Sequence, residues 1–221
     1  MTNLFSIFDP SSSLGVSLNW ISASLGLIIL PPSLFLFGSH TTLLPTKMVE
    51  YLYKEVSILL PLKTRYTMVL FLSLFFIIMF NNSLGLFPHI FTASGQLVFT
   101  LSLAFPLWLA YYFYGWVNKF KYMMAHLVPS GTPSILVPFM VVIETISSLM
   151  RPFTLAVRLA ANMIAGHLLM ALLSSYANIF NSSMVAAVAA SQILLLLLEA
   201  AVAIIQAYVF MVLSVLYASE I

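Results

Sequence analysis

Five long apolar runs dominate this sequence of 221 residues, at about 14–37, 66–88, 97–117, 135–175 and 184–218. Each is longer than the roughly 18 apolar residues that mark a membrane-spanning helix. The composition, with 62% hydrophobic and 6% charged residues, is also far from the balance of a soluble protein. The sequence therefore predicts an all-α integral membrane protein with five membrane crossings, forming a single membrane domain over residues 1–221.

Basic residues alternate along the connections between these runs. The connections that contain them are 38–65, with Lys47, Lys54, Lys63 and Arg65, and 118–134, with Lys119 and Lys121. The first residues and the connections 89–96 and 176–183 contain no Lys or Arg. The positive-inside rule therefore places the two basic connections on the inner side and the N-terminus on the outer side. The first residues also lack the basic region and cleavage site of a signal peptide, so we expect the first helix to remain in the mature protein.

Segment 46–64 differs from the five runs because it mixes charged and apolar residues at roughly helical spacing. Lys47, Glu50, Lys54 and Glu55 alternate there with apolar side chains such as Leu52 and Val56. This pattern favours an amphipathic helix that lies on the inner membrane surface rather than crossing it. A solvated charged loop is the alternative.

The last two runs are too long for upright membrane helices. As helices, 135–175 and 184–218 would extend about 60 Å and 50 Å, against a hydrocarbon core of about 30 Å. They must tilt steeply, kink or break, and Pro138 and Pro152 allow kinks within the first of them. We expect the two runs to form a long, steeply tilted hairpin held against another body.

Ionisable residues inside the fourth run are its main functional signal. Glu144, Arg151 and Arg158 are spaced seven apart, so they lie near one stripe of a helix, and Asn162 extends that stripe. Charged side chains at membrane depth are costly and usually face protein or a water-filled path. The structural alternatives are an Arg158–Glu199 salt bridge, a Glu144–Arg151 pair and a snorkelling role for Arg151.

The predicted hairpin brings polar residues of the last two runs to similar levels. With a turn at about 180–182, Arg158 lies level with about 202–206, near Gln206, and His167 lies level with about 193–197, close to Glu199. His167 is then either a hydrogen-bonded packing residue or a proton carrier, and with Glu199 it could supply two metal ligands. The histidines show no metal-ligand spacing, and the chain has no phosphate loop, nucleophile elbow or basic nucleic-acid patch. We therefore expect no metal, cofactor or nucleic-acid partner.

Several motifs resemble subunit a of the F-type ATP synthase. They are "RLAANMIAGH" at 158–167, "NSLGLFP" at 82–88, "TPSILVPFMVVIETISSLMRPFTLAVR" at 132–158, and the pair Glu199 and Gln206. The resemblance covers nearly the whole chain, and its most specific element is Arg158 followed by Asn162, Gly166 and His167. Histidine at 167 with glutamate at 199 is similar to the mitochondrial form, since bacterial members often carry these two residue types the other way round.

The resemblance implies a stator proton-channel subunit of the rotary ATP synthase, without catalysis by this chain alone. It implies two aqueous half-channels that carry protons to and from the carboxylates of the rotor c-ring, with Arg158 separating them and coupling proton flow to rotation and ATP synthesis. The proton-translocation residues implied are Arg158, Glu199, His167, Gln206, Glu144 and Asn162. We expect His167 and Glu199 on the outer path and Glu144 towards the inner one.

The resemblance also implies partners and a location. The expected partners are the c-ring, other membrane-sector and peripheral-stalk subunits, the lipid bilayer and protons. The expected location is the mitochondrial inner membrane, with the N-terminus in the intermembrane space and the C-terminus in the matrix.

Two other classes of protein would also bury Arg, Glu and His. A secondary proton-coupled transporter should show two related halves with broken helices, and the five unequal runs do not form an inverted repeat. A membrane scaffold gives no reason to bury Arg158 without an acidic neighbour three or four residues away on its helix.

Overall fold

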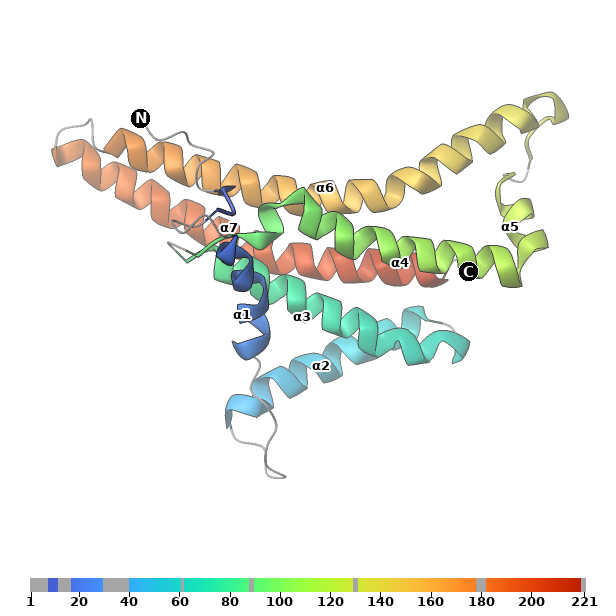
Figure 1. Cartoon of the computed structure of the whole chain (residues 1–221), viewed down its shortest axis with the longest axis horizontal. Helices are drawn as coiled ribbons and strands as arrows, with labels where there is room; N and C mark the ends of the chain where they lie inside the picture. Colours follow the sequence, from blue (N-terminus) through green and yellow to red (C-terminus); the bar gives the residue numbers. More distant parts are fainter. Residues whose placement is uncertain are drawn as a thin grey trace.

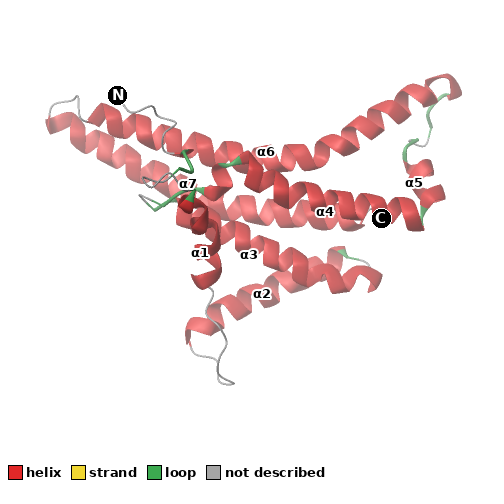
Figure 2. Ribbon diagram, viewed as in Figure 1, coloured by secondary structure: helices red, strands yellow, loops and turns green. Residues whose placement is uncertain are grey.

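The computed structural model describes residues 8–11, 17–29, 40–60, 62–87, 90–128, 131–177 and 182–219. Every regular element in these ranges is helical, as Figure 2 shows, so the predicted all-α class is confirmed for the described chain. The α-helices are α1 (Ser22–Ile29), α2 (His40–Leu59), α3 (Met68–Gly85), α4 (Leu97–Asn118), α5 (Phe120–His126), α6 (Val137–Ala177) and α7 (Ser182–Ser219). The short 3₁₀ helices are η2 (Leu18–Ile21), η3 (Leu62–Thr67), η4 (Ala93–Gly95) and η5 (Ser134–Leu136).

Four stretches of the described chain are long and apolar enough to cross a membrane. They are Arg65–Gly85, Leu97–Asn118, Val137–Ser175 and Val185–Ser219. The predicted first crossing, 14–37, lies partly outside the described residues, and the part that is described forms η2 and α1. The structure thus supports a helical protein with several crossings, and the count of five stays a prediction.

Helices α6 and α7 are by far the longest, with 41 and 38 residues, or about 60 Å and 57 Å at 1.5 Å per residue. They lie side by side over much of their length, and α6 curves away from α7 towards its amino-terminal end (Figure 1). Pro152 lies inside α6, where it removes a backbone hydrogen bond and permits bending. Pro138 is the second residue of α6, in the first turn, where a helix tolerates proline without a kink. The predicted turn and the tilt in the membrane are not tested, since 178–181 lie outside the described residues.

The apolar core is centred on α3, which packs against α7 and α2. Phe71 and Ile78 of α3 and Met211 of α7 are fully buried. Helix α2 joins this core through Leu52 and Val56, while its opposite face is exposed. The predicted amphipathic segment is therefore a helix, beginning at His40 and ending at Leu59, and its position at the membrane surface stays a prediction.

Candidate functional site: polar groups between two long helices

His167 of α6 and Glu199 of α7 face each other inside the helix pair. His167 Nε2 lies 3.8 Å from Glu199 Oε1, and the two side chains are only 12% and 6% exposed. This distance is too long for a direct hydrogen bond, and it is that of an ion pair only when His167 is protonated. The sequence-predicted proximity of the two residues is confirmed, with Glu199 about half a turn beyond the level predicted for His167.

Gly166 makes this close approach possible. A Cβ atom placed on Gly166 would lie 2.5 Å from Glu199 Oε1 and 2.6 Å from Glu199 Cδ. No side chain larger than hydrogen fits at this point unless the carboxylate moves, which is the usual reason for glycine where two membrane helices meet. Gly166 therefore determines where the Glu199 carboxylate lies.

Four further side chains belong to this region and were not predicted as site residues. Phe8 contacts His167, with ring centroids 6.2 Å apart and the planes nearly perpendicular. Asn82 of α3 is fully buried and donates from Nδ2 to the Ala203 carbonyl oxygen of α7 at 3.4 Å. Thr92 and Ser94, in the connection between α3 and α4, are also buried. Asn82 lies in the quoted motif "NSLGLFP", whereas no periodicity in the sequence singles out the other three.

Glu144 and Arg151 form a second polar group in α6, on the amino-terminal side of Arg158. Arg151 Nη2 lies 3.9 Å from Glu144 Oε1, and each side chain is 29% exposed. The Arg151 guanidinium also lies 5.7 Å from the ring centroid of Tyr217, a cation–π contact with α7. Both residues line a pocket whose walls include Trp108 and His126. The pairing considered from the sequence is thus formed, within a partly open aromatic pocket.

Arg158 lies between these two groups and differs from both, because its side chain is exposed. Within the described part of the chain its guanidinium makes no hydrogen bond or ion pair. The internal salt bridge with Glu199 is therefore absent there, and the Glu199 carboxylate lies beside His167 instead. The half-buried Asn162 and Gln206 likewise form no side-chain hydrogen bond to any described residue.

The exposed surface of α6 and α7 is strongly apolar. Large exposed hydrophobic side chains on α6 and α7 include Phe153, Leu169, Leu194, Leu198 and Ile205. A fixed charge on such a face, within a membrane-spanning helix, is stable only with an anionic partner or water beside it. The helices and the site thus define a class: a helical membrane protein that exposes an arginine on the apolar surface of a long helix.

Comparison with known proteins identifies the family. The chain matches the family model described as ATP synthase A chain over residues 20–219. It is 53% identical to ATP synthase subunit a of Drosophila simulans over 222 residues, and 54% identical to ATP synthase subunit a of Anopheles quadrimaculatus and of Aedes aegypti over 224 residues. Each alignment covers 100% of this chain and 99% of the relative. The chain belongs to the ATP synthase A chain family, and the resemblance found in the motifs is confirmed.

Proposed function

We propose that this chain is the stator proton-channel subunit of a mitochondrial rotary ATP synthase. The observation that carries the proposal is Arg158, which is exposed on the apolar face of α6 and α7 without a hydrogen bond or ion pair to any described residue. The missing partner is the carboxylate of a rotor c-ring subunit passing along this face. Family membership supports the assembly, and the insect relatives support the mitochondrial inner membrane.

A fixed positive charge at this point performs a defined task. Arginine does not lose its proton in proteins, so Arg158 remains charged in a low-dielectric contact. A rotor carboxyl group beside Arg158 is favoured in its ionised form, while the same group facing lipid must be neutral. The carboxyl group therefore has to give up a proton on arriving at Arg158 and take up another before it moves on into lipid.

One polar group lies on each side of Arg158 along α6, and each of the two groups is suited to one half-channel. His167 and Glu199 form the outer path, where the two groups are close enough for a small side-chain movement to pass a proton from one to the other. Glu144 and Arg151 form the inner path beside the aromatic pocket. Asn162 and Gln206 lie within about one to two turns of Arg158 in this arrangement and supply polar groups for water near the rotor.

The orientation follows from the charge of the connections. Helix α2, in the basic connection 38–65, carries Lys47 and Lys54, and Lys119 lies between α4 and α5, so we place these segments in or beside the matrix. The N-terminus then lies in the intermembrane space and the C-terminus in the matrix. Other membrane-sector and peripheral-stalk subunits cover the remaining lipid-facing sides.

Disulfide cross-linking in the assembled complex tests the contact with the rotor. The chain has no cysteine, so Ala161→Cys, exposed one turn after Arg158, introduces a single thiol. Oxidation should join it to a cysteine placed beside the carboxylate of the c subunit and should stop ATP synthesis. The control is Phe105→Cys on the exposed side of α4, which should form no cross-link. Equal cross-linking of both variants, or of neither, would contradict the proposal.

Replacement of His167 by Gln separates a proton carrier from a water organiser. Glutamine retains hydrogen bonding but does not titrate, so the dependence of proton flux on pH should change if His167 carries protons. Flux through vesicles containing the assembled complex is measured over a series of pH values, with wild type in parallel. An unchanged profile at an unchanged rate would show that His167 only organises water.

A further inference from the structure

We infer that the connection between α3 and α4 forms part of the wall of the outer proton path. In this inference Thr92 and Ser94 hold the water molecules that lead to His167 and Glu199, and Phe8 closes the path beside His167. The inference rests on the proposed function, and it concerns residues that neither the motifs nor the family match single out.

The connection is unusual because it is buried. Connections normally lie on the surface, since their backbone and side-chain polar groups need water. Here Thr92, Ala93, Ser94 and Gly95 are all buried, and Ser94 is 0% exposed. A Cβ atom placed on Gly85 of α3 would lie 2.5 Å from Thr92 Cγ2 and 3.4 Å from Met163 Cε of α6. The connection is therefore inserted between α3 and α6, about one turn from His167.

The polar atoms in this region share one property. Among the described residues, none forms a hydrogen bond with the buried atoms Asn82 Oδ1, Thr92 Oγ1, Ser94 Oγ, His167 Nε2, Glu199 Oε1 and Glu199 Oε2. By contrast, Ser83 and Ser102, on the flanking helices, each donate to a carbonyl oxygen of their own helix. Buried polar groups that lack protein partners are usually satisfied by water, and each buried water needs two to four such partners. The cluster thus has the composition of a buried water site that ends at Glu199.

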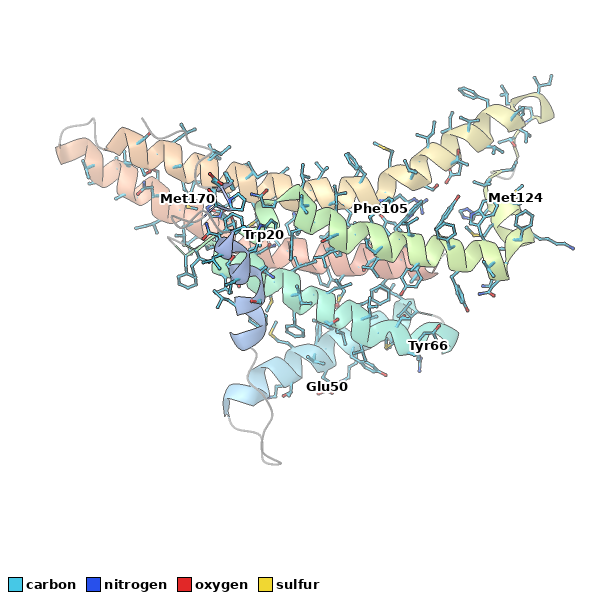
Figure 3. The ribbon with its side chains drawn as sticks, viewed as in Figure 1. Trp20, Glu50, Tyr66, Phe105, Met124 and Met170 are labelled. Atoms are coloured by element: carbon cyan, nitrogen blue, oxygen red, sulfur yellow. The ribbon has the colours of Figure 1, made fainter. Side chains whose placement is uncertain are left out.

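The N-terminal segment packs over this connection at three described points. Gln96 Nε2 donates to the Phe8 carbonyl oxygen at 2.7 Å, and Ser22 Oγ donates to the Phe91 carbonyl oxygen at 2.9 Å. Trp20, labelled in Figure 3, packs edge-on against Phe91 with ring centroids 5.8 Å apart. These contacts hold the N-terminal segment against the outer end of the bundle.

Phe8 is placed to seal the water site. Its ring contacts His167 on one side, and a Cβ atom placed on Gly95 would lie 3.4 Å from Phe8 Cε1 on the other. An apolar ring at this position excludes bulk water from the side of His167 and leaves access along Thr92 and Ser94. Phe8 is thus a positioning residue, held by the Gln96 hydrogen bond rather than by any chemistry of its own.

Thiol accessibility in the assembled complex tests the inference. We expect a charged, water-soluble methanethiosulfonate reagent added from the outer side to modify Ser94→Cys and to lower proton flux by roughly tenfold or more, because these reagents react with the thiolate, which forms only in contact with water. The matched control is Ser102→Cys, five residues after the start of α4, whereas Ser94 lies three residues before it. The Ser102 side chain is on the exposed side of α4, which faces lipid rather than water in the proposed function, so the control should stay unmodified. Adding Phe8→Ala to Ser94→Cys should increase the modification rate several-fold.

Each result has a defined meaning. If Ser94→Cys is not modified, or is modified without a change in proton flux, the assignment of Ser94 to the proton path is overturned. If adding Phe8→Ala leaves the rate of thiol modification unchanged, the assignment of Phe8 as the residue that closes the path is overturned. If Ser94→Cys does not assemble, Thr92→Val should lower flux while Thr92→Ser retains it, and equal flux in both variants would overturn the assignment. The stator function is judged separately by the Ala161→Cys cross-link, so failure of one inference is distinguishable from failure of the other.

Discussion

Replacement of Arg158 by Gln should reduce proton-driven ATP synthesis at least about a hundredfold, because removing one partner of a desolvated ion pair costs about 3–5 kcal/mol. In the proposed function, the rotor carboxylate would lose the fixed counter-charge supplied by Arg158 and would not ionise there. Passive proton leak should rise in the same vesicles, since in the proposed function Arg158 also separates the two paths. Synthesis and leak are measured on the assembled complex, whose subunit content is checked by gel.

Two variants distinguish a fixed charge from charge in general. Arg158→Lys keeps a positive group but one that loses its proton when desolvated, so it should also fail to synthesise ATP. Arg151→Gln removes the other arginine of the same stripe, which contacts Glu144 and Tyr217 inside the protein, and it should lower synthesis only partly. Normal synthesis with Arg158→Gln in an intact complex would contradict the proposed function.

Gly166→Ala should lower ATP synthesis by roughly tenfold or more, because misplacing a reacting group by about 1 Å can cost about a hundredfold. The added methyl group would lie 2.5 Å from Glu199 Oε1 and must displace the carboxylate from His167. The measurement is proton flux and ATP synthesis in reconstituted vesicles, with complex assembly unchanged.

The double variant Gly166→Ala with Glu199→Asp tests the geometric cause. Aspartate is one methylene shorter, so its carboxylate is withdrawn from the added methyl group. If the clash is the cause, the double variant should lose less activity than the product of the two single losses. Losses that simply multiply would show that Gly166 acts in some other way.

Helix positions were largely predictable from the sequence, because long apolar runs determine them directly. The runs 97–117 and 135–175 correspond closely to Leu97–Asn118 and Val137–Ala177. Helix α5 was missed, since its seven residues lie in a connection marked mainly by charge. The start of α2 at His40 was also missed, because the charged pattern used to find it begins at Lys47.

The candidate site was predictable only where its residues interrupt an apolar helix. Arg158, His167 and Glu199 stand out for that reason, and hairpin register brought the last two together. Thr92 and Ser94 could not be found this way, because a polar residue in a connection is ordinary in sequence and becomes informative only when it is buried. The contact between Phe8 and His167 joins residues that are 159 positions apart in the sequence. No local sequence pattern encodes a contact over such a separation.

The stretch of α6 between its two polar groups has an electrical consequence. Leu155, Ala156, Leu159, Ala160 and Met163 are all at most 5% exposed, so the inward side of this stretch, about 12 Å long, is dry protein. Where water reaches in from both sides of a membrane, the transmembrane voltage falls mainly across the dry material left between. In the proposed function, Arg158 and the rotor carboxylate meet where the electric field is strongest, and most of the roughly 2.3 kcal/mol per 100 mV carried by each proton is released over this short distance.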